Sequence, residues 1–145
     1  MTVLVEGGKY CSFKVGELLF GIDVQDVQEV LRYQEITRVP LAPPVVRGLI
    51  NLRGQIVTAV DMRRQLNMED RPAGVMPMNV IVRTREDPIS LLVDEIGDVI
   101  EVDPEGFEDI PPTVSGVVRE LMSGVHKLSE GLLLVLKTER AVSIC

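Results

Sequence analysis

The sequence predicts an all-β fold, and three observations indicate it. Short apolar runs recur about every 8–12 residues with turn-forming residues between them, as in β-sandwiches and small barrels. Val, Ile and Leu dominate a composition that is 46% hydrophobic but only 3% aromatic, which suits tightly packed strands. The two halves of the chain also repeat a weak order of hairpin, link, hairpin and short helix. This repetition predicts two similar small barrels.

The first elements are predicted to be a hairpin and a short helix. Residues 10–15 alternate in side-chain type, residues 17–22 form a second apolar run, and Gly16 between them supplies the turn. Asp23 has the character of a helix N-cap, and apolar residues follow it at helical spacing. We therefore expect an amphipathic helix of about two turns over residues 24–31.

A proline-rich break comes next. Pro40, Pro43 and Pro44 interrupt the chain, since proline lacks the amide that regular structure needs. Pro44 is suited to open a short helical turn and Gly48 to close it. The sequence therefore predicts a loop with one helical turn before the following strand.

The most informative stretch is residues 45–66, which read VVRGLINLRGQIVTAVDMRRQL. It predicts a hairpin with strands over residues 49–52 and 55–60. Arg53 and Gly54 form the turn, where glycine adopts a positive φ without penalty.

The end of this stretch predicts a short helix and then a loop. Asp61 is expected to cap a helix that carries Met62, Gln65 and Leu66. Residues 67–77 are polar and contain prolines and a glycine, so they are expected to form the loop between two lobes. The expected domain is a single one over residues 1–145, with lobe 1 at about 14–70 and lobe 2 at about 77–138.

The second half predicts further hairpins. We expect strands over 78–84, 89–93, 97–102, 121–128 and 131–136, with an acidic, proline-containing loop over 103–116. Thr138 is expected to cap a terminal helical turn.

Charge and hydropathy exclude several classes of partner. The net charge of −7, from 15 basic and 22 acidic side chains, opposes binding to nucleic acid or to anionic lipid. No apolar run approaches the roughly 18–20 residues of a membrane span, and no signal peptide is evident at the N-terminus. Cys11 and Cys145 lie near opposite ends of the chain and are expected to be single thiols. We expect a cytoplasmic protein without direct membrane insertion.

No pattern indicates catalytic chemistry. His126, the only histidine, falls in a predicted strand, where an exposed or hydrogen-bonded structural role is expected. The carboxylates between Asp94 and Asp109 lack the ligand order of an EF-hand and are expected to form a solvated acidic face. No nucleophile elbow, P-loop or dinucleotide fingerprint is present. We therefore expect neither an enzyme nor a metal or cofactor site.

Arg53 is the one polar residue whose local pattern suggests a role in binding a partner. A guanidinium at a hairpin tip offers a rigid fork of donors that suits pairing with a carboxylate at an interface. The alternative, a solvated turn arginine, stays open on the local pattern alone.

Four segments carry a resemblance to a known family. Residues 45–66 closely resemble the hallmark stretch of CheW-like domains, and GIDVQDVQEVL over residues 21–31 resembles the family's upstream helix. LLVDEIGDVIEV (residues 91–102) and GLLLVLKTERAV (residues 131–142) resemble its later strands and closing helix. The resemblance covers nearly the whole chain, from about Lys9 onward.

This resemblance implies a fold and a role. It implies two five-stranded, SH3-like barrels that share a hydrophobic core, with short helices. It also implies a non-catalytic adaptor that couples chemoreceptors to a CheA-type histidine kinase. The expected partners are the regulatory domain of that kinase and the cytoplasmic tip of the receptors. Weak self-association or ring assembly is a further expectation, as is recruitment to receptor clusters at the inner face of the membrane.

The resemblance also implies partner-binding residues. In the family, the first lobe carries the main kinase contact and the groove between the lobes receives the receptor. The glutamate at Glu29 is implied to pair with the NLRG arginine, here Arg53. The residues that correspond by position are Val27, Glu29, Asn51, Arg53, Gly54 and Val99.

Other functions remain open. The chain is also consistent with a CheW-like module of another receptor–kinase pathway, such as twitching or gliding motility. A small-molecule sensor would place a ligand in the inter-lobe groove, although the sequence shows no cluster of convergent polar groups. A hydrolase using Asp94, Asp98 and Asp103 is supported only by the acidic second half.

Overall fold

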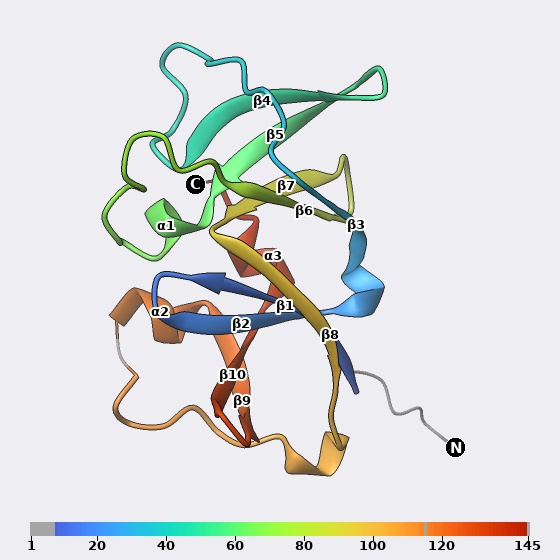
Figure 1. The fold of residues 1–145 in the computed structure, drawn as a ribbon, viewed down its shortest axis with the longest axis vertical. Helices are drawn as coiled ribbons and strands as arrows, with labels where there is room; N and C mark the ends of the chain where they lie inside the picture. Colours follow the sequence, from blue (N-terminus) through green and yellow to red (C-terminus); the bar gives the residue numbers. More distant parts are fainter. Residues whose placement is uncertain (1–7, 115, 145) are drawn as a thin grey trace.

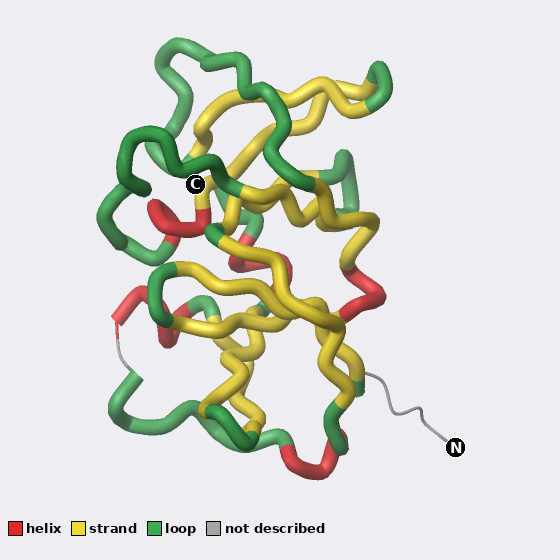
Figure 2. Tube along the Cα trace, in the orientation of Figure 1, coloured by secondary structure: helices red, strands yellow, loops and turns green. Residues whose placement is uncertain are grey.

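Strands dominate the computed structural model, which describes residues 8–114 and 116–144 (Figures 1 and 2). Within these residues the strands form two five-stranded sheets, connected by loops and short helices. The predicted all-β class with two five-stranded halves is confirmed.

Sheet A occupies the lower half of Figure 1. Its strands are β1 (Lys9–Val15), β2 (Leu18–Asp23), β8 (Glu95–Glu101), β9 (Met122–Leu128) and β10 (Gly131–Leu136). Their order across the sheet is β8-β1-β2-β10-β9. Neighbouring strands are antiparallel except β2 and β10, which are parallel. Hairpins from the two ends of the chain therefore meet in one sheet.

Sheet B occupies the upper half of Figure 1. Its strands are β3 (Val27–Leu31), β4 (Val46–Leu52), β5 (Gln55–Asp61), β6 (Met78–Val82) and β7 (Ile89–Val93). Their order is β3-β6-β7-β5-β4, and the parallel pair is β5 and β7. Each sheet thus contains one parallel contact between two hairpins.

The strand pairing corrects the expected lobe boundaries of about 14–70 and 77–138. β6 and β7 pair within sheet B, whereas β1 and β2 pair with strands from the second half of the chain. Residues 67–77 connect two parts of sheet B and are not the link between the sheets. The described chain crosses between sheets at the 3₁₀ turn η1 (Val24–Asp26) and at Asp94, between β7 and β8. Turn signals predict hairpins, but they do not predict which hairpins share a sheet.

A shared apolar core joins the sheets. One buried cluster combines Phe13 and Phe20 of sheet A with Val60 and Leu91 of sheet B. All four side chains are fully buried, and the two phenyl rings stack with their centroids 6.1 Å apart. Burial of each such side chain stabilises the fold by roughly 1.5–3 kcal/mol, so the common core holds the sheets as one unit.

The helix expected over residues 24–31 is wrong. Only η1 is helical, and β3 follows it. β3 pairs with β6, so that Glu29 lies opposite Ile81. Valines at these positions fit a strand as well as a helix face, and pairing with β6 decides between the two.

The helical turn expected between Pro44 and Gly48 is also wrong, because β4 begins at Val46. Gly48 has a φ of +150° and lies under the loop that follows β3. A Cβ built on Gly48 would lie 2.2 Å from the carbonyl oxygen of Thr37. The glycine therefore permits a close backbone approach and does not end a helix.

The other short helices agree in part with prediction. Helix α1 (Met62–Gln65) begins as expected, since the Asp61 side chain accepts a bond of 3.0 Å from the Arg63 amide. Helices η2 (Pro104–Gly106) and α2 (Gly116–Glu120) were not predicted. In α3 (Thr138–Ala141) the Thr138 side chain does not cap the helix, because its hydroxyl donates to Asp26 at 2.7 Å. Cys145 lies outside the described residues.

Candidate partner-binding surface

The tip of the β4–β5 hairpin presents the predicted arginine. Leu52 and Gln55 pair directly, and Arg53 and Gly54 between them have φ values of +51° and +89°. Positive φ at both central residues is the pattern of a type I′ turn, which matches the twist of a hairpin. The Asn51 side-chain oxygen accepts a bond of 2.8 Å from the Gly54 amide. The turn is therefore held from below, and Arg53 stands at its apex.

Arg53 forms an ion pair with Glu29, as the resemblance implies. The guanidinium donates to the Glu29 carboxylate, and 66% of the Arg53 side chain remains exposed. Glu29 lies on β3 and Arg53 follows β4, which are the two outer strands of sheet B. An exposed pair of this kind contributes less than about 1 kcal/mol to stability. Its main effect is to orient two charges where the two outer strands of sheet B approach each other.

Backbone bonds close the same side of sheet B. Thr37 and Leu49 each donate an amide bond of 2.8 Å to the other's carbonyl. This bridge ties the loop after β3 to β4, so the ends of the sheet are connected without a further strand. Glu29 and Arg53 are held on a closed framework.

The remaining predicted residues lie in different surroundings. Val27 is only 9% exposed and belongs to the shared core, so its side chain supports β3 and offers little contact surface. Val99 is 57% exposed on β8, an outer strand of sheet A. The structure thus brings together Glu29, Asn51, Arg53 and Gly54, and it places Val27 and Val99 apart from this group.

Sequence reasoning missed a network of ion pairs around Asp61. This carboxylate is fully buried at the end of β5 and receives Arg47 at 2.9 Å and Arg71 at 3.0 Å. Arg71 also donates to the Leu92 carbonyl at 3.0 Å. The loop over residues 67–77 is therefore fixed to sheet B through Arg71.

Asp94 extends this network to the crossing between the sheets. Its carboxylate lies 2.7 Å from Arg63 and 2.8 Å from Arg71, and it accepts a bond of 2.7 Å from the Gly16 amide. Burial raises the pKa of Asp94, but bonds from Arg63 and Gly16 and the nearby arginine charges outweigh it and hold the pKa below the ordinary value. Gly16 lies in the turn between β1 and β2 of sheet A, and Arg63 lies in α1, which follows β5 of sheet B. Asp94 therefore joins the two sheets.

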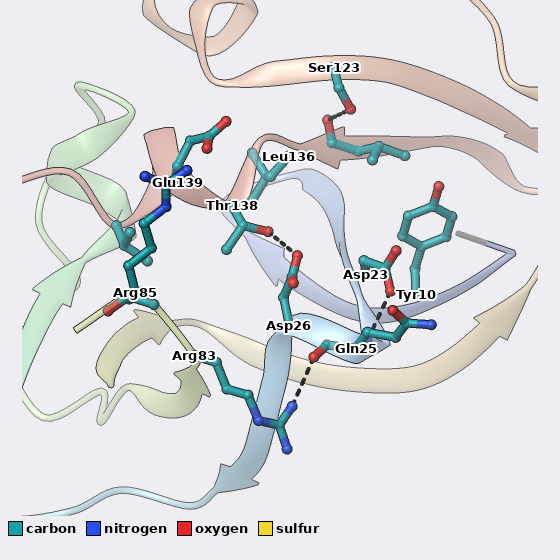
Figure 3. A pocket seen from close by; sticks show the side chains of 13 residues that line it. Tyr10, Asp23, Gln25, Asp26, Arg83, Arg85, Ser123, Leu136, Thr138 and Glu139 are labelled. Carbon is teal, nitrogen blue, oxygen red and sulfur yellow. Dashed lines mark hydrogen bonds between the residues drawn. The ribbon is translucent and has the colours of Figure 1, made fainter. Parts of the chain in front are cut away.

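A second missed feature is a pocket of about 640 Å³ between the sheets (Figure 3). Its wall combines β1, β2, β9 and β10 of sheet A with the β6–β7 turn and α3. The lining side chains with charge are Asp23, Asp26, Arg83, Arg85 and Glu139. Such convergence of polar groups was not evident in the sequence, because three separate segments supply them.

Hydrogen bonds fix part of this pocket. Arg83 donates to the carbonyls of Gln25 and Val27, each at 2.9 Å, and so holds η1 against the end of β6. Asp26 accepts the Thr138 hydroxyl from the opposite side. Burial and the Asp23 carboxylate raise the pKa of Tyr10, so its hydroxyl stays protonated as a donor. These bonds tie η1 to β6 and to α3 beside the pocket, whose lining presents both positive and negative groups.

His126 is neither exposed nor fully hydrogen-bonded, contrary to expectation. It is 2% exposed on β9, between the rings of Tyr10 and Phe107, and its Nε2 has no partner among the described residues. Burial lowers the pKa of His126, while Asp103 and Glu108 oppose this effect. A neutral imidazole therefore packs as part of an aromatic layer.

The three carboxylates considered for hydrolysis lie in separate surroundings. Asp94 is held by arginines, Asp103 caps η2 by accepting the Glu105 amide at 3.0 Å, and Asp98 is exposed on β8. Among residues 8–114 and 116–144, no three metal-binding side chains gather where they could hold an ion. No helix in that part of the chain is long and apolar enough to cross a membrane.

Comparison with known proteins decides the family. A family model described as the CheW-like domain matches residues 9–144. The chain belongs to the CheW-like family. The predicted resemblance is therefore confirmed, and it extends over almost the full sequence.

Individual CheW relatives agree in sequence and in fold. The chain is 27% identical to the chemotaxis protein CheW of Treponema pallidum, over 99% of this chain and 86% of the relative. It is 32% identical to CheW of Bacillus subtilis, over 79% and 74% of the two chains. The crystal structure of the scaffolding protein TtCheW from Thermoanaerobacter tengcongensis matches with a TM-score of 0.80 and 29% identity, covering 90% of this chain and 89% of that one. Membership of this family confirms the predicted role of a coupling adaptor in chemosensory signalling.

Proposed function

We propose that this CheW-like protein couples chemoreceptors to a CheA-type histidine kinase, and that it does so by binding alone. The Arg53–Glu29 pair is the observation that carries the proposal for the kinase contact. It displays a largely exposed guanidinium on a braced hairpin tip, next to a carboxylate that a partner's cation can share.

Exposed apolar side chains on β3 and β5 are further candidates for the proposed kinase contact. Val30 follows Glu29 on β3 and is 42% exposed, and Ile56 lies just beyond the hairpin turn and is 56% exposed. Interfaces typically combine a desolvated apolar centre with a polar rim. Because successive strand residues face opposite sides of a sheet, Val30 points away from Glu29, so a partner that wraps around the edge of sheet B would contact both.

The receptor is proposed to bind elsewhere, at the outer strand of sheet A. β8 has β1 on one side only among the described strands, so its other edge is free to contact an added segment. Val99 projects from this strand with more than half of its surface exposed. Two surfaces on two sheets would let one molecule hold the kinase and a receptor tip at once.

The cellular setting follows from these contacts. Binding to receptor tips would recruit the protein to receptor clusters at the inner face of the membrane. Two different contact surfaces also permit weak self-association or ring assembly with the kinase domain, because heterologous contacts build closed rings. The same surfaces would serve another receptor–kinase pathway, such as twitching or gliding motility, with different partners.

The test is a calorimetric titration against the full-length CheA-type kinase from the same organism. We expect saturable binding, at least tenfold weaker for Arg53→Ala and partly recovered by Arg53→Glu combined with Glu29→Arg. Arg140→Ala on α3 is the matched control and should bind as the unmodified protein does. Absence of kinase binding by the folded, unmodified protein would refute the proposal.

The pocket in Figure 3 favours a second candidate function, a small-molecule-binding module. Its volume of about 640 Å³ lies within the range of ligand sites, and charged groups of both signs line it. A thermal-shift screen with a metabolite library tests this candidate. A ligand that raises Tm for the unmodified protein but not for Arg85→Ala would support it, and a screen without stabilising compounds would reject it.

A further inference from the structure

One apolar side chain in the loop between β3 and β4 is fully exposed to solvent. Residues 38–44 read Arg-Val-Pro-Leu-Ala-Pro-Pro and arch over sheet B at the top of Figure 1. Leu41 has a relative exposure of 103%, greater than any other large apolar side chain among the described residues. It therefore makes no packing contribution to the fold.

The backbone at Leu41 is also unfavourable for leucine. Its φ is +64°, in the left-handed region that side chains with a Cβ rarely adopt. The Ala42 amide donates to the Val39 carbonyl at 3.4 Å, so residues 39–42 form a turn with Pro40 second and Leu41 third. Proline second and positive φ third is the pattern of a type II turn, where glycine or asparagine is preferred in the third place. Leu41 gains nothing from this position in the isolated molecule.

Hydrogen bonds hold both ends of this loop and so define the position of Leu41. Arg64 donates to the Pro44 carbonyl at 2.8 Å, and the Val46 amide donates to the Pro43 carbonyl at 2.9 Å. The bridge between Thr37 and Leu49 holds the other end of the loop. A side chain ordered in advance loses less conformational entropy when a partner covers it.

Positive charge surrounds this loop although the whole chain carries −7. Arg38, Arg47 and Arg64 line a hollow of about 340 Å³ beside the turn. Arg47 and Arg64 have carboxylate partners in Asp61 and Asp70, whereas Arg38 has none among the described residues. The complementary surface on a partner is an apolar socket bordered by carboxylates.

The proposed kinase contact needs such an anchor. An exposed ion pair contributes little binding energy, and interfaces usually depend on a few large side chains that a partner covers fully. A stable interface also covers roughly 800 Å² on each partner, which is more than a hairpin tip provides. The loop precedes β4 and Arg53 follows it, so the proposed contact would extend along this seven-residue outer strand.

We propose that Leu41 is the apolar anchor of the kinase contact and inserts into a carboxylate-bordered socket on the CheA-type kinase. This inference rests on the proposed function and deepens it. The unfavourable backbone at Leu41 is retained because the side chain acts in the complex and not in the free protein.

The experiment compares stability with binding in the same variants. Leu41→Asn and Leu41→Gly both suit positive φ, so Tm should be unchanged or higher by about 2–4 °C. Calorimetric titration with the full-length kinase should show binding at least tenfold weaker for both variants. Val75→Asn is the matched control, since Val75 is 50% exposed on the other loop, and it should bind normally. Arg38→Glu should weaken binding more at low salt than at high salt.

The outcomes separate the two proposals. Kinase binding by the unmodified protein with equal affinity for both Leu41 variants would overturn the anchor and leave the proposed function intact. Weaker binding of a receptor-tip fragment, with kinase binding unchanged, would also overturn it. Absence of kinase binding by the unmodified protein would overturn both proposals. A marked fall in Tm of both variants would show that Leu41 supports the fold and would overturn the anchor as well.

Discussion

Gly48 shows how a single residue shapes the framework under the candidate surface. The loop after β3 approaches β4 so closely that a Cβ at this position would lie 2.2 Å from the Thr37 carbonyl oxygen. The same approach lets Thr37 and Leu49 exchange two backbone bonds. Sheet closure at this point therefore depends on the absence of a side chain, whereas the sequence pattern predicts only that Gly48 ends a helical turn.

Replacing Gly48 tests this role. Gly48→Ala should lower the free energy of unfolding by about 2–4 kcal/mol, because the new methyl group meets backbone that cannot move aside. Gly74→Ala is the matched control, since Gly74 has a φ of +89° but open space around it, and its cost should be about 1 kcal/mol. Urea unfolding measures both values. Equal costs would show that backbone conformation alone matters at Gly48.

At the scale of elements, the hairpins were predictable and their partners were not. Arg53 and Gly54 were identified as a turn because the pattern is local, and the structure has that turn. The helix predicted over residues 24–31 is wrong, because the valines of this segment fit both a helix and a strand. Only pairing with β6 decides between the two. The Arg53–Glu29 pair was expected from family resemblance, whereas composition and spacing gave no sign of it.

The bond between Thr138 and Asp26 links α3 to η1 across 112 residues of sequence. Thr138→Val should cost about 1.5–3 kcal/mol, because a partly buried carboxylate loses its donor while the side-chain shape is kept. Thr138→Ser retains the hydroxyl and should recover most of this stability. Thermal unfolding of the three proteins measures the difference. If Thr138→Val were as stable as the unmodified protein, the hydrogen bond would contribute nothing to stability.

For the whole molecule, the decisive fact is that strands from both ends of the chain share sheet A. The chain therefore leaves sheet A, forms sheet B and returns to sheet A at Asp94. This crossing has to be held in place. The network from Asp61 through Arg71 to Asp94 supplies this. The members of this network lie far apart in sequence, so no local motif predicts it. This network and the common core hold the two proposed partner surfaces, which lie on different sheets, in a fixed relation.

The network makes stability depend on pH in a definite direction. The pKa of Asp94 is below its ordinary value in the folded protein, so its contribution is fully present above the unfolded pKa of about 3.9 and is lost as pH falls through the lower folded value. Asp94→Asn should lower the free energy of unfolding by about 2–4 kcal/mol at pH 7, because Arg63 and Arg71 lose a partly buried counter-charge. The difference from the unmodified protein should persist down to about pH 4 and shrink as pH falls further.

Asp70→Asn is the control for this prediction. The Arg64 hydrogen bond and charge also lower the pKa of Asp70, but its side chain is 56% exposed and water screens the pair. Urea unfolding across the pH range should therefore show a small, nearly constant difference for Asp70→Asn. Parallel pH profiles for Asp94→Asn and the unmodified protein would mean that Asp94 does not hold the sheets together by charge. The core of Phe13, Phe20, Val60 and Leu91 would then be what fixes the two partner surfaces relative to each other.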